Sequence, residues 1–245
     1  MTESTVRIKM FERLKLAAAC VVVACCGACF QGKVGDLKME SKSVELGGAK
    51  TVTVELKIGV GQLRVTGGAK KLLEADFLYN VARWRPEVKY EVQGSHGLLV
   101  IRQPDFGSNA MGNARNEWNL SLNKTVPMDL KIECGVGESN FELGGLSLTG
   151  LDVKTGVGET TLDLIGDWKR DLEANVKGGI GQVTLHLPDK IGVRVQAQKA
   201  IGSIEATGLR KENGSYVNDA LGKSQATLNL HVQAGIGEIR LESGG

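Results

Sequence analysis

The chain has 245 residues, of which 30 are Lys or Arg and 28 are Asp or Glu, so its formal net charge is +2. The charges are interspersed, which excludes the basic stripe of a nucleic-acid-binding domain and a block of acidic residues. The length leaves room for one domain with a sizeable core after a leader segment.

The first 24 residues have the pattern of a lipoprotein-type signal peptide. Basic residues precede a short apolar run, Leu16 to Ala28, which is too brief for a comfortable membrane span. Val22-Val23-Ala24-Cys25 resembles a bacterial lipobox, so Cys25 is the expected lipidation site and Cys29 is the alternative. A lipid on the new N-terminal cysteine would anchor an extracytoplasmic domain to a bacterial membrane. A signal anchor or plain secretion are the other interpretations of this segment.

Residues 25–49 are expected to hold the lipidated cysteine and a flexible tether, because no hydrophobic periodicity is present before Val44. From Val52 onward apolar and polar residues alternate, with Val52, Val54, Leu56 and Ile58 on one side, as in a half-buried strand. Similar runs follow, and we expect an N-terminal β section at residues 50–117.

A small-apolar-Gly step interrupts these runs six times, and self-similarity of this kind indicates a repeat architecture. Five steps begin with Gly, and the sixth reads Ala200-Ile201-Gly202. We expect a corner at each step, where positive φ or a close backbone approach excludes a Cβ, and we expect the apolar middle residue to point inward. The glycines of the predicted corners are Gly59, Gly61, Gly135, Gly137, Gly156, Gly158, Gly179, Gly181, Gly202, Gly235 and Gly237.

The repeat array covers residues 118–245 and is continuous with the N-terminal β section. Alternating runs flank each glycine step, and no segment has the periodicity of an amphipathic helix. The sequence therefore predicts an all-β fold, a β-solenoid-like stack of short strands with Gly-x-Gly corners. A twisted two-sheet β-sandwich is the alternative.

Outward positions form ladders across such a stack if its units lie in register. One ladder contains Glu138, Glu159, Gln182, Ser203 and Glu238, and another contains Glu142, Asp163, His186, Thr207 and Glu242. The candidate binding face consists of Glu138, Glu142, Glu159, Asp163 and His186. A histidine beside two carboxylates could bind a divalent cation weakly, but a solvated strand face is the simpler interpretation, and we predict no metal site.

The residues give little support to catalysis or to nucleotide binding. The third glycine of the dinucleotide fingerprint is missing at every step, and a strand follows instead of a helix. Ser95 and His96 are adjacent, which is the wrong geometry for a nucleophile and its base. The carboxylate pair that a glycan hydrolase needs is suggested only by Glu142 and Asp163. We expect no enzyme, no cofactor, and neither nucleotide nor nucleic acid as a partner.

The stretch Trp118–Asn123, leading through Pro127 to Gly135-Val136-Gly137-Glu138, resembles the bacterial toast-rack family of envelope proteins. It is also similar to the C-terminal domain of LiaF-type regulators of cell-envelope stress signalling. Gly156-Val157-Gly158-Glu159 and Tyr216-Val217-Asn218 carry the same resemblance, which covers roughly residues 50–245. The resemblance implies an all-β, solenoid-like stack without enzymatic activity, and the better understood relatives restrain a sensor kinase.

The sequence thus predicts a non-catalytic, membrane-anchored extracytoplasmic protein with a binding or regulatory role, for which envelope stress sensing is one hypothesis. Its expected partner is an unidentified envelope protein. The alternative is a structural envelope protein that self-associates through an exposed edge strand.

Overall fold

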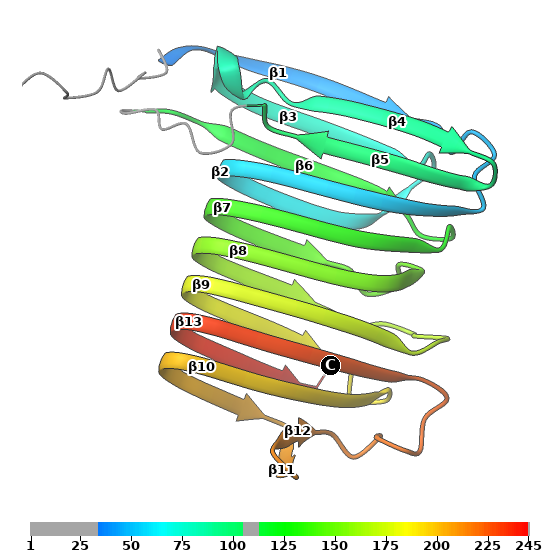
Figure 1. Ribbon diagram of the computed structural model, residues 1–245, viewed down its shortest axis with the longest axis vertical. Coiled ribbons are helices and arrows are strands. Elements are labelled where there is room, and N and C mark those ends of the chain that lie inside the picture. The colour runs from blue at the N-terminus through cyan, green and yellow to red at the C-terminus, as the bar shows by residue number, and fades with distance from the viewer. Residues whose placement is uncertain (1–33, 105–112, 245) are drawn as a thin grey trace, which may run out of the picture. The chain divides into compact units, whose positions relative to one another are not determined.

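The computed structural model describes residues 34–104 and 113–244, and its strands form one 13-stranded sheet (Figure 1). The described helical structure is one short 3-10 turn, η1 (Ala82–Trp84). The all-β, solenoid-like fold is confirmed. Strands β2 (Thr51–Ala69), β7 (Met128–Glu142), β8 (Leu148–Asp163), β9 (Leu172–Leu187), β10 (Gly192–Thr207) and β13 (Thr227–Ser243) are long, and the shorter strands are β1 (Val34–Val44), β3 (Leu73–Val81), β4 (Glu87–Gln93), β5 (His96–Arg102), β6 (Asn116–Asn123), β11 (Arg210–Glu212) and β12 (Ser215–Val217).

Each long strand contains one glycine step and bends there, so that one continuous strand contributes to two layers (Figure 1). The first layer holds the halves before the step together with β4 and β5, and the second layer holds the halves after the step together with β1, β3 and β6. The long strands are parallel to one another, and their glycine steps lie in register.

The second glycine of each step has a backbone conformation that other residues rarely adopt. Gly158 has a φ of +136°, and a Cβ built on it would overlap the carbonyl oxygen of Gly137 on the neighbouring strand. The backbones approach so closely because every strand bends at the same level. A side chain at this position would therefore meet both an unfavourable φ and a steric clash.

The middle residue of each step points outward, and the prediction that it points inward is wrong. Val157 is 45% exposed and Ile201 is 64% exposed. On β8 the buried side chains nearest the bend are Val153 before it and Thr160 after it. Residues on one face of a regular strand are an even number of positions apart, but these two are an odd number apart. The alternation of buried and exposed side chains is therefore interrupted at the glycine step. The side chain between the two glycines is left on the convex side of the bend.

Among the six long strands, the spatial order departs from chain order at one place, because β13 lies between β9 and β10. Residues 208–226 include β11 and β12, and the chain returns from them to insert its last strand into the stack. All long strands carry the same alternation, so the pattern of side chains alone does not distinguish the two orders.

Residues 34–44, which the sequence analysis placed in a flexible tether, form strand β1, and the prediction of a tether up to residue 49 is wrong. β1 pairs antiparallel with β3, with Glu40 opposite Phe77 and Val44 opposite Leu73. Its sequence lacks strong periodicity because β1 is the outermost strand of the second layer and most of its side chains are exposed.

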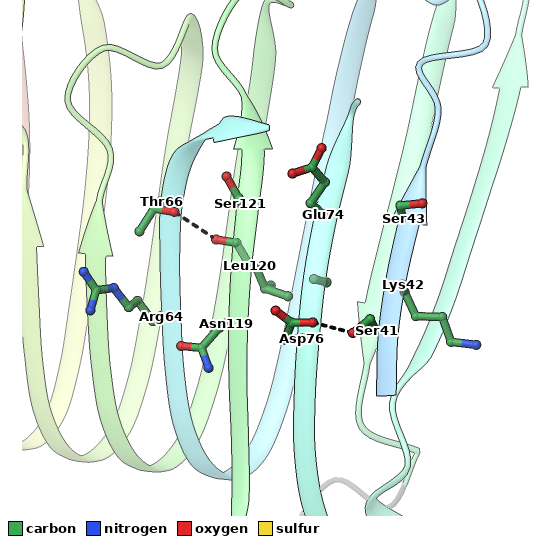
Figure 2. Close-up of a pocket in the computed structure, with 11 residues that line it drawn as sticks. Ser41, Lys42, Ser43, Arg64, Thr66, Glu74, Asp76, Asn119, Leu120 and Ser121 are labelled. Atoms are coloured by element: carbon green, nitrogen blue, oxygen red, sulfur yellow. Dashed lines mark hydrogen bonds between the residues drawn. The ribbon is translucent and has the colours of Figure 1, made fainter. Parts of the chain in front are cut away.

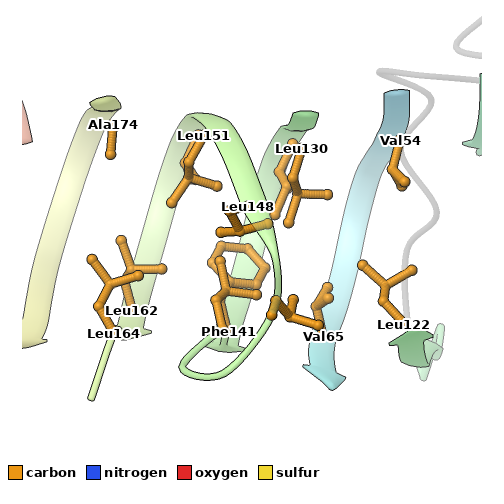
Figure 3. Close-up of a cluster of buried hydrophobic side chains, with 14 of the residues drawn as sticks. Val54, Val65, Leu122, Leu130, Phe141, Leu148, Leu151, Leu162, Leu164 and Ala174 are labelled. Carbon is orange, nitrogen blue, oxygen red and sulfur yellow. The ribbon is translucent and has the colours of Figure 1, made fainter. Parts of the chain in front are cut away.

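The core lies between the two layers. Figure 3 shows Val54, Leu130 and Leu151 from the first layer opposite Phe141 and Leu162 from the second. These side chains are at most 1% exposed. Each fully buried aliphatic side chain contributes about 1.5–3 kcal/mol, so stacking the strands stabilises corners that would not form alone.

Two buried amides complete the bend of β2, where neighbouring strands are interrupted. β5 pairs with the first half of β2 and β6 with the second half. The Gln103 Oε1 atom accepts hydrogen bonds from the Gly59 N–H (3.1 Å) and from Asn116 Nδ2 (3.0 Å), and Asn116 Nδ2 also donates to the Val60 carbonyl (2.7 Å). These side chains supply the partners that a continuous strand would provide elsewhere.

Candidate binding surface

The outward side chains of the second layer form a surface that we call the acidic face. It consists of three rows that cross the sheet from β1 to β10, because successive strands are paired in register. The basic residues of these rows are Arg64, Arg240 and His186. The carboxylates of the rows are Glu74, Asp76, Glu117, Glu138, Glu142, Glu159, Asp163, Glu205, Glu238 and Glu242.

All five residues of the predicted binding face lie on this surface. Glu138 is directly opposite Glu159, Glu142 is opposite Asp163, and Asp163 is opposite His186. The insertion of β13 corrects the expected neighbours beyond β9, because His186 is followed by Glu242 and not by Thr207. The His186 Nδ1 atom lies 3.2 Å from Glu242 Oε2.

Glu138 and Glu159 are like-charged neighbours on the acidic face, and neither is in an ion pair with a described residue. Other carboxylates of this face are paired, since Arg64 lies 2.6 Å from Glu142 and Arg240 lies 2.9 Å from Glu238. On the outer side of the first layer, Lys57 lies 3.4 Å from Glu133, and Lys131 lies 3.9 Å from Glu55. Like charges directly opposite one another destabilise a sheet, so the contact between Glu138 and Glu159 is unfavourable for folding.

A groove runs over the part of the acidic face formed by β1, β3, β6 and β2. Its hollow has a volume of about 680 Å³ (Figure 2). The Ser41 hydroxyl donates to Asp76 Oδ1 at 2.5 Å, and the Thr66 hydroxyl donates to the Leu120 carbonyl at 3.4 Å. The lining residues are Ser41, Lys42, Ser43, Arg64, Thr66, Glu74, Ala75, Asp76, Asn119, Leu120 and Ser121.

A second hollow of about 340 Å³ continues this groove toward β8 and shares Arg64 and Asn119 with the first. Glu138 and Glu159 line it. The Arg64 Nη2 atom donates to Glu142 Oε1 at 2.6 Å, so one cation is held between the two hollows. The groove therefore combines hydroxyl, amide and carboxylate groups with little positive charge.

The sequence analysis missed Asp76, Asn119 and Arg64 as members of this surface. They are brought together because β6 lies between β3 and β2, with Asp76 opposite Asn119 and Asn119 opposite Arg64. The alternation of Glu74 and Asp76 with buried residues was a signal that these side chains face outward. Nothing in that alternation indicates which strands are neighbours.

A buried tyrosine and a carboxylate join β1 to β3 near η1. The Tyr79 hydroxyl donates to Glu40 Oε1 at 2.5 Å, and the Arg85 Nε atom lies 2.8 Å from the same oxygen. The hydrogen bond from Tyr79, with further help from Arg85, lowers the pKa of Glu40. Burial, followed by the bond to Glu40, raises the pKa of Tyr79 to about 12.

The described residues offer little reactive chemistry. Burial raises the pKa of the Cys134 thiol to about 11, so this thiol is protonated at neutral pH and a poor nucleophile. No group of three or more His, Cys, Asp or Glu side chains in the described ranges has a geometry suited to a metal ion. The arrangement is suited to binding through charge and hydrogen bonds.

The two candidate lipidation sites, Cys25 and Cys29, lie outside the described residues. Within residues 34–104 and 113–244, no helix is long and apolar enough to cross a membrane.

Comparisons with known proteins agree with this architecture. A crystal structure from Clostridium sporogenes, described as "a putative cell adhesion protein", is 37% identical, covers 85% of this chain and all of its own, and superimposes with a TM-score of 0.82. Structures described as putative adhesins from Bacteroides fragilis and Parabacteroides distasonis are 12% and 11% identical, with TM-scores of 0.35 and 0.26. The first covers 85% of this chain and 99% of its own, and the second covers 87% and 99%.

No curated protein matches the chain. Residues 33–186 match the family model described as the N-terminal domain of toast_rack, DUF2154. Because this match spans more than half of the sequence and the Clostridium sporogenes structure is similar over its full length, the chain belongs to the toast-rack family.

Proposed function

We propose that this protein is a non-catalytic, membrane-anchored envelope protein that binds a basic partner protein through its acidic face. The observation that carries the proposal is the pair of directly opposite carboxylates, Glu138 and Glu159, neither of which is in an ion pair with a described residue. Sites where a local stability rule is broken without compensation are frequently functional. A cationic partner would relieve this repulsion, so the electrostatic free energy that destabilises the fold would favour binding.

Family membership and the similar structure support a binding or structural role outside the cell. The Clostridium sporogenes structure, which shares the fold over its full length, is described as a putative cell adhesion protein. We propose that this chain is extracytoplasmic and held at the membrane by a lipid on Cys25, with Cys29 as the alternative site. The basic extracytoplasmic part of a membrane sensor is the partner that fits a role in envelope stress sensing.

Zero-length coupling with a carbodiimide tests the proposal, because it joins carboxylates to lysines in direct contact. We expect treated cell envelopes to yield links from Glu138, Glu159 or Asp163 to lysines of a second protein. The triple variant Glu138→Gln, Glu159→Gln, Asp163→Asn should abolish the links. The matched control changes Glu55, Glu133 and Asp152, three carboxylates on the outer side of the first layer, and should leave the links intact. Absence of links from the acidic face would refute the proposal.

A second candidate function is self-association, because most of the outer edge of β10 is open. β10 pairs with β12 only at Arg194 and Val195, so Gln196–Thr207 has no strand on its outer side among the described residues. Ile204 and Ala206 are only partly buried there, whereas the equivalent Ile239 and Leu241 of β13 are fully buried. An open edge of this kind can pair with another copy. Sedimentation that depends on protein concentration, with carbodiimide links confined to Glu205, would favour this function.

A further inference from the structure

The middle residues of the glycine steps form a continuous line, which we call the apolar ridge; Val60 is half-buried and the other five are exposed. It consists of Val60, Val136, Val157, Ile180, Ile236 and Ile201, in that spatial order. Each side chain lies opposite the next because the steps are in register. At about 4.8 Å per strand, the ridge is roughly 24 Å long.

The ridge is apolar and projects beyond its surroundings. From Val136 to Ile201 its side chains are between 45% and 64% exposed. Glycine stands after every ridge residue, so no neighbouring side chain covers the line on that side. Contiguous apolar surface of this kind on a soluble domain indicates a contact with a partner or a membrane.

Opposite charges lie on the two sides of the ridge. On the first-layer side, three residues before the ridge, stand Lys57, Lys154 and Lys177, interrupted by Glu133. On the second-layer side stand Glu138 and Glu159, two residues after the ridge. An anionic surface would therefore attract the first-layer side of the ridge and repel the acidic face.

The described chain begins at the same edge. Val34 is opposite Val81 on β3, Tyr79 of that strand is opposite Asn116, and Asn116 Nδ2 donates to the carbonyl of the ridge residue Val60. The start of β1 and the bends of the long strands accordingly lie on the same side in Figure 1.

The length of chain between the candidate lipidation sites and the first described strand indicates how near the bilayer the ridge would lie. A lipid on Cys25 would be connected to Val34 by at most roughly 30 Å of extended chain, and a lipid on Cys29 by about 18 Å. The anchor would then be attached to the domain at the edge that carries the ridge.

We infer that the apolar ridge rests on an anionic lipid bilayer, with the lysine row among the headgroups and the acidic face turned toward solvent. The inference rests on the proposed lipid anchor and deepens it by assigning the surface that meets the membrane. Aliphatic side chains enter the interfacial region while the flanking lysines contact phosphate groups. The acidic face then remains accessible to a partner.

Tryptophan fluorescence of the full-length, lipidated protein tests this orientation, since Trp84, Trp118 and Trp168 are all buried. The variant Val157→Trp places a reporter on the ridge. The matched control, Leu98→Trp, places it at an exposed position on β5 that is distant from the ridge along the strand direction. Both are incorporated into phosphatidylglycerol–phosphatidylethanolamine vesicles, with and without brominated lipid.

We expect the Val157→Trp emission to shift to shorter wavelength and to be quenched by brominated lipid, with neither effect in Leu98→Trp. Replacing Val136 and Ile180, the ridge residues on either side of position 157, by Asp in the Val157→Trp variant should abolish the quenching while flotation with vesicles persists. Flotation without quenching in Val157→Trp would overturn the ridge inference and leave the anchor intact. Failure to float, together with no palmitate on Cys25 or Cys29, would overturn both. A blue shift that depends on protein concentration and needs no vesicles would assign the ridge to a second copy and refute the inference.

Discussion

Glu138 and Glu159 lie directly opposite each other on the parallel strands β7 and β8, and neither is in an ion pair with a described residue. Gln62 Nε2 donates to Glu138 Oε2 at 3.1 Å, but it brings no charge. The same two strands place Lys154 next to Glu133 on the other side of the bend, 3.6 Å apart. These two strands thus place a like-charge contact on one side of the bend and an ion pair on the other.

Removal of one charge from this pair should stabilise the fold. Glu159→Gln is expected to raise the free energy of unfolding by about 0.2–1 kcal/mol at low salt, because it abolishes a like-charge contact. Urea denaturation measures the change. Lys154→Gln, on the same strand, removes an attractive contact and should not stabilise. Equal effects of the two substitutions would contradict the electrostatic difference between the faces.

The glycine corner predicts a large penalty for a side chain at Gly158. Gly158→Val should cost more than about 1 kcal/mol, because the φ of +136° is unfavourable and the Cβ would overlap the carbonyl of Gly137. Gly145→Ala separates these causes, since Gly145 has a φ of +84° but open space around its Cβ. The midpoint temperature of thermal unfolding should be well below that of Gly145→Ala in the Gly158→Val variant. A Gly158→Val variant as stable as the parent chain would refute the corner model.

The buried amides at the bend of β2 should matter more than exposed amides. Gln103→Ala leaves the Gly59 N–H without its side-chain partner, and the expected loss is about 1–3 kcal/mol. Gln62→Ala removes an exposed amide from the same region and should have little effect. Chemical denaturation of both variants tests the difference, which would be absent if water replaced the Gln103 carbonyl without cost.

The Tyr79–Glu40 pair should make stability depend on pH at both extremes. The folded chain holds the Tyr79 proton to about pH 12 and the unfolded chain releases it near 10, so this contribution is complete below about pH 10 and is lost as pH rises through 12. The lowered pKa of Glu40 acts in the opposite direction, so its contribution is present above the ordinary carboxyl pKa and is lost as pH falls. Tyr79→Phe should reduce both dependences when unfolding is followed from about pH 2 to about pH 12. Unchanged pH profiles would show that the pair does not couple to folding.

Local features of this fold could be predicted from the sequence, and contacts between distant segments could not. The bends at Gly158 and its equivalents require a residue without a Cβ, and the alternation that puts Glu138 beside Glu159 follows from strands in register. The position of β13 depends on the path of residues 208–226, and many strand orders satisfy the same alternation. The exposure of Val157 follows from a bend that interrupts the alternation.

The first strand and the groove illustrate a second limit. β1 has few buried side chains because it lies at the edge of the second layer, so its sequence resembles a linker. Asn119 belongs to the groove only because β6 lies between β3 and β2. The amides of Gln103 and Asn116 replace a missing strand, and no periodic pattern indicates that role.

The central claim, that the acidic face and not the opposite surface binds the partner, is tested most directly by photo-crosslinking in living cells from two positions of β8. A photoreactive phenylalanine derivative at Glu159 lies on the acidic face, and the same residue at Asp152 lies on the outer side of the first layer. The account predicts a recurrent basic protein trapped from position 159 and not from position 152. The same protein trapped equally from both positions, or from position 152 alone, would contradict it.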